Sequence, residues 1–172
     1  MCYNYIRWYD KGSDSVGKVN YVLTSTDEVA NYFLCKSGMT QKKLQKLVYY
    51  AYAWFIALHN EKCDEITNIL FPEKPEAWVH GPVFPSLYTQ YKNFNWDEIP
   101  LKEDCKFKNF NSNLISFLDE VWEVFGKMSA DRLELMTHNE EPWKRARGNC
   151  SRMTPSKNNI DSKIIFNYYN SL

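Results

Sequence analysis

Histidine and cysteine side chains are the groups in this chain that could support nucleophilic catalysis or metal binding. His59 and Cys63 have the spacing of two ligands on one helical face, but no second pair lies near them, which favours a structural role. A Cys–His nucleophilic pair could be assembled from distant positions, although most chains of this composition offer such combinations. No HExxH, P-loop, GxGxxG or GxSxG motif occurs. The sequence therefore predicts a protein without catalytic residues, metal or cofactor.

The cysteine pattern bears on the cellular compartment. No two cysteines have a CxxC spacing, their number is odd and no signal peptide precedes them, which predicts reduced thiols in a cytoplasmic protein. These cysteines are Cys2, Cys35, Cys63, Cys105 and Cys150. The most apolar run, residues 48–58, is about half the length needed to span a bilayer, so no membrane association is expected.

Length and composition indicate a single folded domain. The chain has 172 residues, of which 44% are apolar and 16% aromatic, and these values exclude a disordered protein. The net charge is zero, but residues 64–141 contain 15 acidic and 7 basic residues, so the remainder is basic. This bias could steer a charged partner, although solvated faces that happen to segregate explain it equally simply and are favoured.

Hydrophobic periodicity predicts mostly helices. A Ser25–Glu28 capping box opens a helix over 25–36, and Thr40 opens another that extends to about Asn60. From Val48 this second helix is apolar all round, which is typical of a helix at the centre of a domain. Further helices are predicted from Ser86 and over 112–125, 130–138 (capped by Ser129), a segment capped by Asn139, and 159–172, with a polar loop at 95–110.

The period changes between about residues 64 and 84. Prolines and the Gly81-Pro82 turn predict two short strands there, and His80 is expected to satisfy nearby backbone groups. The segment 1–23 has two aromatic and β-branched runs around a polar turn, which allows a second hairpin. The predicted fold is therefore mainly α: a single compact helical domain with a small β-hairpin in its centre. Four anchors are expected to be buried in it: Leu47, Trp54, Trp78 and Trp122.

Three ordered motifs carry a resemblance to a known family. The first has the form T-x-x-K-L-Q-K-L-x-Y-x-A and comprises Thr40, Lys43, Leu44, Gln45, Lys46, Leu47, Tyr49 and Ala51. The second has the form E-A-W-x-x-G-P-V and comprises Glu76, Ala77, Trp78, Gly81, Pro82 and Val83. The third comprises Ser129, Leu133, Thr137, His138, Pro142 and Trp143. Together these motifs resemble the SocA-like antitoxin family, also called the Panacea domain or DUF4065.

The resemblance extends over about residues 24–172 and leaves 1–23 as an extension outside the family pattern. It implies a non-enzymatic antitoxin, of a kind often encoded in phages or mobile elements, that neutralises a co-encoded toxin by direct binding. Tyrosine and tryptophan supply much of the energy at interfaces, so the extension and the 76–91 turn are the expected partner-binding elements. Their candidate residues are Tyr3, Tyr5, Trp8, Tyr9, Tyr21, Trp78, His80 and Tyr88. A hairpin at 1–23 that merely covers an edge of the domain is equally compatible with the sequence.

Two alternative functions stay open at this point. Helices 25–36 and 40–60 resemble a helix-turn-helix with the hairpin as a wing, which predicts a nucleic-acid-binding regulator. That interpretation requires the side chains of four residues on the second helix to face outward: Gln41, Lys42, Lys43 and Lys46. Against it, the second helix becomes apolar all round after one turn, so nucleic acid is the less favoured partner. The other alternative is an adaptor that presents a partner to a protease.

Overall fold

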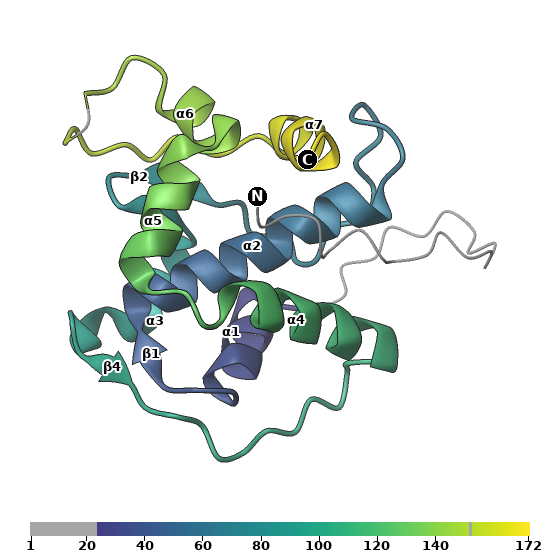
Figure 1. Cartoon of the computed structure of the whole chain (residues 1–172), viewed down its shortest axis with the longest axis vertical. Coiled ribbons are helices and arrows are strands. Elements are labelled where there is room, and N and C mark those ends of the chain that lie inside the picture. The colour runs from purple at the N-terminus through teal and green to yellow at the C-terminus, as the bar shows by residue number, and fades with distance from the viewer. Residues whose placement is uncertain (1–23, 152) are drawn as a thin grey trace.

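The described part of the chain, residues 24–151 and 153–172 of a computed structural model, is built around one central helix, α2 (Gln41–His59). Figure 1 shows the other helices packed along and across it. In chain order the remaining helices are α1 (Thr26–Leu34), α3 (Pro85–Tyr91), the 3₁₀ helix η2 (Lys92–Phe94), α4 (Ser112–Phe125), α5 (Ala130–Asn139), α6 (Glu141–Arg147) and α7 (Ser162–Asn170). The prediction of a mainly α fold is confirmed.

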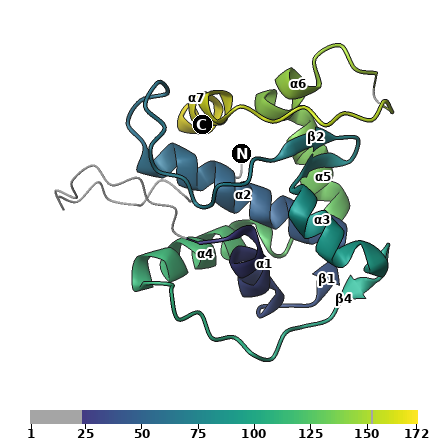
Figure 2. The same cartoon turned by 180° about the vertical axis from the view of Figure 1, so that it is seen from behind.

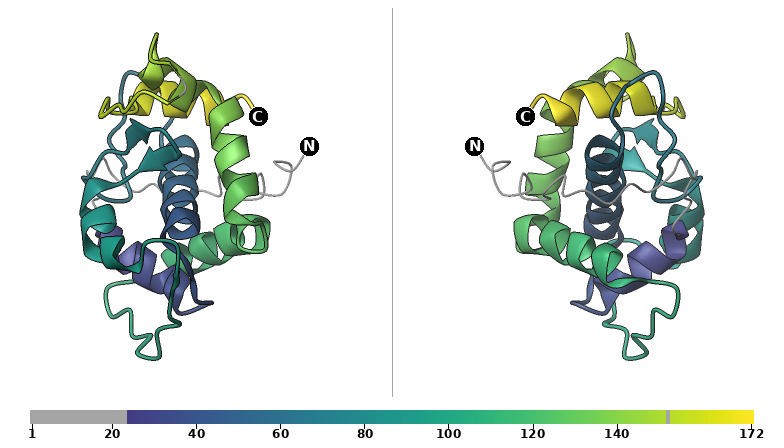
Figure 3. Two further views of the ribbon diagram at one scale, coloured as in Figure 1. Left: turned by 90° about the vertical axis from the view of Figure 1, so that its left-hand side faces the viewer. Right: turned by 90° about the vertical axis from the view of Figure 1, so that its right-hand side faces the viewer.

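The burial of α2 explains why its neighbours surround it. Every side chain from Leu44 to Ala57 is buried, so this helix needs contacts on all sides. It packs against α1, α4, α5, α7 and β3 (Gly81–Val83). Viewed along its axis, α2 lies inside a ring made by these elements (Figure 3). The predicted central helix is therefore confirmed.

Two small antiparallel sheets complete the described part. Strand β2 (Glu76–Trp78) pairs with β3, with Trp78 opposite Gly81, so the predicted central hairpin is present. The predicted position of its turn is wrong, because the turn is at residues 79–80 and Gly81-Pro82 begins β3. The second sheet joins β1 (Met39–Thr40) to β4 (Glu98–Ile99) and was not predicted. Its strands have two residues each, too few to leave a period-2 pattern. Seen from behind, the hairpin and α3 lie on one side of α2 (Figure 2).

The helix caps follow the sequence with one exception. At α1 the Glu28 amide donates to Ser25 Oγ at 3.2 Å and the Ser25 amide donates to the Glu28 carboxylate at 3.1 Å, so the capping box is present. The prediction that Asn139 caps the next helix is wrong, because Asn139 is the last residue of α5. Glu140 precedes α6 instead, and its buried carboxylate accepts hydrogen bonds from two tyrosines, Tyr50 at 2.9 Å and Tyr169 at 2.6 Å.

The four residues predicted to be buried fall into two groups. Leu47 and Trp54 are buried in the core, as expected. Trp78 and Trp122 are only half-buried, which corrects the prediction for both. Trp122 lies at the margin of the α4 stripe, where one face of its ring stacks on Phe33 and Lys43 lies over the ring. Amphipathic periodicity places such a residue toward the core but does not say how far the neighbouring helix covers it.

A disulfide overturns the prediction of five reduced thiols. Cys35, just after α1, is bonded to Cys105 in the loop before α4, with a Cα–Cα distance of 5.9 Å. The two residues are 70 positions apart, so no local spacing signals the pair. Cys63 and Cys150 are free thiols.

Residues 1–23 lie outside the described residues, together with the hairpin predicted there and the candidates Tyr3, Tyr5, Trp8, Tyr9 and Tyr21. Over the described ranges, no helix combines the length and the apolar character needed to cross a membrane.

Candidate partner-binding site

The three sequence motifs meet where the first turns of α2, the β2–β3 hairpin and α5 come together. Side chains from α2 hold the backbone of the hairpin and of α3 in place. The Gln45 side chain forms two hydrogen bonds with Phe84: the Phe84 amide donates to Oε1 at 2.8 Å, and Nε2 donates to the Phe84 carbonyl at 3.2 Å. One turn earlier, Gln41 Nε2 donates to the Tyr88 carbonyl at 2.9 Å. These bonds attach the backbone just after β3 and within α3 to the first turns of α2.

Lys46 fixes the second strand of the hairpin. Its side chain is buried, with 1% of the residue exposed, and Nζ donates to the Pro82 carbonyl at 2.9 Å. Burial lowers the pKa of this amine to about 7, because a charged ammonium loses its hydration there; the negative charge of Glu134 partly opposes this shift.

Gly81 gives Lys46 the space that it occupies. Its φ of +96° is a conformation that residues with a side chain rarely adopt. A Cβ at this position would lie 2.6 Å from Lys46 Cε and 2.8 Å from Thr137 Oγ1. The glycine of the second motif, the lysine of the first and the threonine of the third are therefore packed against one another.

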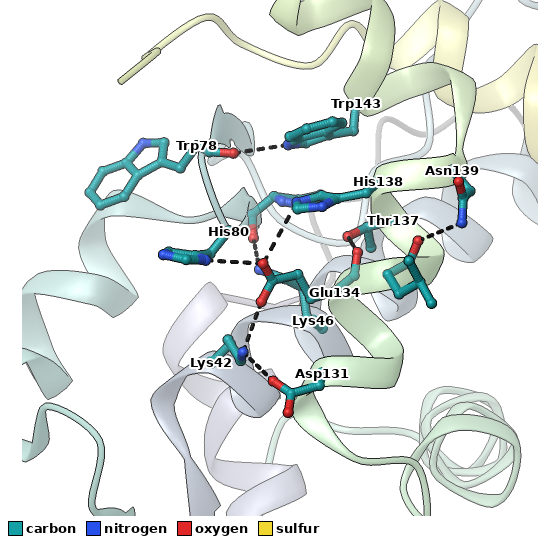
Figure 4. A network of polar contacts seen from close by, with 12 residues as sticks. Lys42, Lys46, Trp78, His80, Asp131, Glu134, Thr137, His138, Asn139 and Trp143 are labelled. Carbon is teal, nitrogen blue, oxygen red and sulfur yellow. Dashed lines mark hydrogen bonds and ion pairs between the residues drawn. The ribbon is translucent and has the colours of Figure 1, made fainter. Parts of the chain in front are cut away.

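Glu134 on α5 links the same elements by charge (Figure 4). Its carboxylate accepts hydrogen bonds from Lys42 Nζ at 2.8 Å and from His80 Nδ1 at 3.0 Å. Lys42 also binds Asp131 at 2.5 Å. Burial alone would raise the pKa of Glu134, but the bonds from Lys42 and His80 outweigh it and lower this pKa to about 2. The expectation that His80 satisfies local backbone groups is thus wrong, because its ring binds a carboxylate 54 residues away.

The third motif closes the other side of the hairpin. Trp143 Nε1 donates to the Trp78 carbonyl at 3.0 Å, and its ring stacks on His138 with the ring centroids 4.1 Å apart. The fully buried Thr137 donates its hydroxyl to the Glu134 carbonyl at 2.9 Å. These contacts tie α5 and α6 to β2, so the interior of the hairpin is held by framework residues from three motifs.

The outer side of this framework borders a pocket of about 760 Å³, which we call the hairpin pocket. Its apolar wall consists mainly of Trp78, Val83, Tyr88 and Trp96, and its lysines are Lys42, Lys46, Lys92 and Lys157. Tyr88 is 40% exposed and Trp96 is 75% exposed. A pocket of this size, with apolar walls and a few charged groups, has the dimensions of a ligand or anchor-residue site.

The predicted residues of the turn converge on this pocket. Trp78, His80 and Tyr88 all line it, and the Trp78 and Tyr88 rings lie 4.9 Å apart. Tyr88 lies on the face of α3 that is turned away from the core, and its ring faces the pocket and solvent. Sequence reasoning missed Trp96 and Glu134. The sequence offered one weak signal for each: Trp96 is an isolated aromatic residue in a polar loop, and Glu134 is an acid four residues before His138.

The groove-reading surface required by the helix-turn-helix interpretation is not formed. Gln41 and Lys46 are buried, with exposed fractions of 7% and 1%, and bind backbone carbonyls rather than facing outward. Lys42 and Lys43 are half-buried, and Lys42 is held by two carboxylates. A recognition helix presents such side chains to base edges and phosphates, which α2 does not.

Over the described residues, no group of three or more His, Cys, Asp or Glu side chains has the arrangement of a metal site. His59, which has ligand-like spacing to Cys63, stacks on Phe55 and shares a 3.1 Å hydrogen bond with the Phe55 carbonyl. Burial lowers the pKa of His59, consistent with a core histidine.

A family model described as "Antitoxin SocA-like, Panacea domain" matches residues 44–144. This chain belongs to the SocA-like, Panacea-domain family. The matched region holds the second and third motifs completely and most of the first, so Lys46, Gly81 and Thr137, which pack against one another, all lie within it. Neither the comparison with curated proteins nor that with solved structures finds a match.

Proposed function

We propose that this protein is the antitoxin of a toxin–antitoxin system and neutralises a co-encoded toxin by binding it directly. Membership of the SocA-like antitoxin family is the observation that carries this proposal. The geometry supports it, because the motif residues act as a framework and leave aromatic side chains exposed around the hairpin. We further propose that the protein acts in the cytoplasm without catalysis and without a cofactor. Its gene would belong to a phage or mobile element.

We place the contact surface on the hairpin pocket and its rim. Trp78, Tyr88 and Trp96 are tryptophan and tyrosine side chains beside a concave surface, and such anchors dominate binding energies at interfaces. The rigid framework beneath them reduces the conformational entropy lost on binding. Segment 1–23 is proposed as a second, chain-specific contact, because it lies outside the family pattern and is rich in tyrosine and tryptophan.

Co-expression with the adjacent gene tests the proposal. Expression of that gene alone should stop growth, and the full-length chain should restore it. A chain that starts at Thr24 should fold, as the core described here lies within it, but should rescue poorly. Full rescue by the shortened chain would remove segment 1–23 from the interface. A neighbouring gene that does not affect growth would contradict the antitoxin proposal itself.

A further inference from the structure

The hairpin pocket combines two features that point to one kind of ligand. The first is an exposed aromatic wall. Trp96 and Tyr88 are two of the few large apolar side chains exposed in the described residues, and both line the same pocket. Grouped exposed aromatic residues of this kind mark interaction sites.

The second feature is an excess of positive charge. Four lysines line the pocket, whereas Asp131 is the only carboxylate among its described lining residues, and this carboxylate is bound to Lys42. The ammonium groups of Lys46, Lys92 and Lys157 form no ion pair with any described residue. Lys92 and Lys157 are exposed and form part of the pocket rim, whereas Lys46 is a buried part of its lining.

We propose that the hairpin pocket binds an acidic peptide segment with an aromatic anchor residue. The anchor packs between Trp78, Tyr88 and Trp96, and carboxylates on either side of it pair with Lys92 and Lys157 on the rim. This proposal deepens the proposed function, since the segment would be supplied by the toxin.

The buried amine of Lys46 adds a reason for a carboxylate. Burial lowers the pKa of this amine to about 7; the negative charge of Glu134 opposes this shift, and the positive charge of Lys42 adds to it. A carboxylate that enters the pocket favours the charged form, because an opposite charge compensates for lost hydration. Binding of an acidic ligand is therefore coupled to proton uptake above neutral pH.

A peptide fits these observations better than a nucleic acid does. The chain has 21 basic and 21 acidic residues and thus no net positive charge, whereas nucleic-acid-binding domains carry a basic surface.

The test uses the purified full-length chain and a fluorescein-labelled peptide, Asp-Glu-Trp-Glu-Asp, followed by fluorescence anisotropy. Two control peptides separate the features: Asn-Gln-Trp-Gln-Asn lacks the charges, and Asp-Glu-Gly-Glu-Asp lacks the anchor. We expect the labelled acidic peptide to bind at least about tenfold more tightly than either control, as ion pairs and a buried aromatic each add roughly 1.4 kcal/mol or more. Its affinity should also fall with added salt.

Variants at exposed positions locate the binding without disturbing the fold. Lys92→Glu combined with Lys157→Glu, and separately Trp96→Ala, should each weaken binding at least about tenfold. Lys108→Glu and Leu135→Ala change exposed residues that do not line the pocket and should leave binding unchanged. Proton uptake on peptide binding can be measured by isothermal titration calorimetry at pH 8 in buffers of different ionisation enthalpy. The wild type should take up protons when it binds the acidic peptide, and the Lys46→Met variant should not.

Several outcomes would overturn the proposal. These are equal binding of the three peptides, insensitivity to the pocket variants, tighter binding of a single-stranded oligonucleotide at the same lysines, or self-association abolished by Trp96→Ala. If the chain rescues cells from the toxin but does not bind the acidic peptide, the pocket proposal is contradicted and the antitoxin proposal stands. If the chain binds the peptide but the neighbouring gene is harmless, the antitoxin proposal is contradicted and the pocket proposal stands.

Discussion

Replacing Gly81 with alanine tests whether the three motifs form one packed framework. Two effects should add in this variant. The φ of +96° is strained for a residue with a side chain, which costs about 1–3 kcal/mol. The new methyl group would also lie 2.6 Å from Lys46 Cε and 2.8 Å from Thr137 Oγ1, and overpacking in a filled interior costs about 1–3 kcal/mol more. Neither neighbour moves freely, because Thr137 is fully buried and Lys46 is bound to Pro82.

Gly148 provides a matched control. It also has a positive φ, +54°, but the nearest atom to an added Cβ is 4.0 Å away. Gly148→Ala should therefore show the backbone cost alone, about 1–3 kcal/mol, whereas Gly81→Ala should lose about 2–6 kcal/mol. Urea unfolding followed by tryptophan fluorescence measures both free energies. If Gly81→Ala proves no more destabilising than Gly148→Ala, the packing of Gly81 against Lys46 and Thr137 is not as described.

Further predictions concern the core, two titrating groups and the disulfide. Trp54→Ala should lower the free energy of unfolding by about 3–5 kcal/mol, whereas Trp96→Ala, at a 75% exposed position, should change it by less than about 0.5 kcal/mol; a wild-type melting temperature for Trp54→Ala would refute the burial of this ring. The folded pKa of Glu134 lies below its unfolded value, so its stabilising contribution is complete above about pH 5 and is lost as the pH falls toward 2. The stability difference between wild type and Glu134→Gln should accordingly shrink over that range in acid titrations. The folded pKa of Lys46 is also lowered, so the unfolded chain binds more protons above pH 7 and stability should rise from pH 7 to 8.5; Lys46→Met should lack this rise in chemical unfolding at each pH. Reduction of the bond between Cys35 and Cys105, which are 70 residues apart in sequence, should cost about 2–4 kcal/mol. In thermal melts, dithiothreitol should lower the melting temperature of the wild type and of Cys63→Ser, which keeps the bond, but not that of Cys35→Ser.

Local patterns in the sequence were enough to predict the helices. The apolar stripe of α4 and the all-round apolar α2 specify which faces are buried, and the Ser25 capping box marks the start of α1. These features depend on neighbours within four residues, so they can be read without a fold. The hairpin was predictable for the same reason, because glycine and proline mark a change of chain direction, although the turn itself is at residues 79–80.

The candidate site depended on contacts that local patterns do not contain. Lys46 and Gln41 are polar residues on a helix, and their burial follows from backbone carbonyls supplied by the hairpin and α3. The bond between His80 and Glu134 joins residues 54 positions apart, and Cys35 and Cys105 are separated by 70. Trp96 joined the pocket only because η2 and β4 place its loop near Tyr88. Tertiary placement therefore decides which polar residues are framework and which aromatic residues are available to a partner.

The central claim, direct neutralisation of a toxin, is tested most directly by titrating the purified product of the adjacent gene with the purified full-length chain. Isothermal titration calorimetry should show a complex of fixed stoichiometry, and growth inhibition in co-expression should disappear only for variants that retain this complex. The Lys92→Glu, Lys157→Glu double variant and Trp96→Ala should weaken the complex and the rescue together, while Lys108→Glu should preserve both. Rescue of growth in the absence of any measurable complex would contradict neutralisation by direct binding.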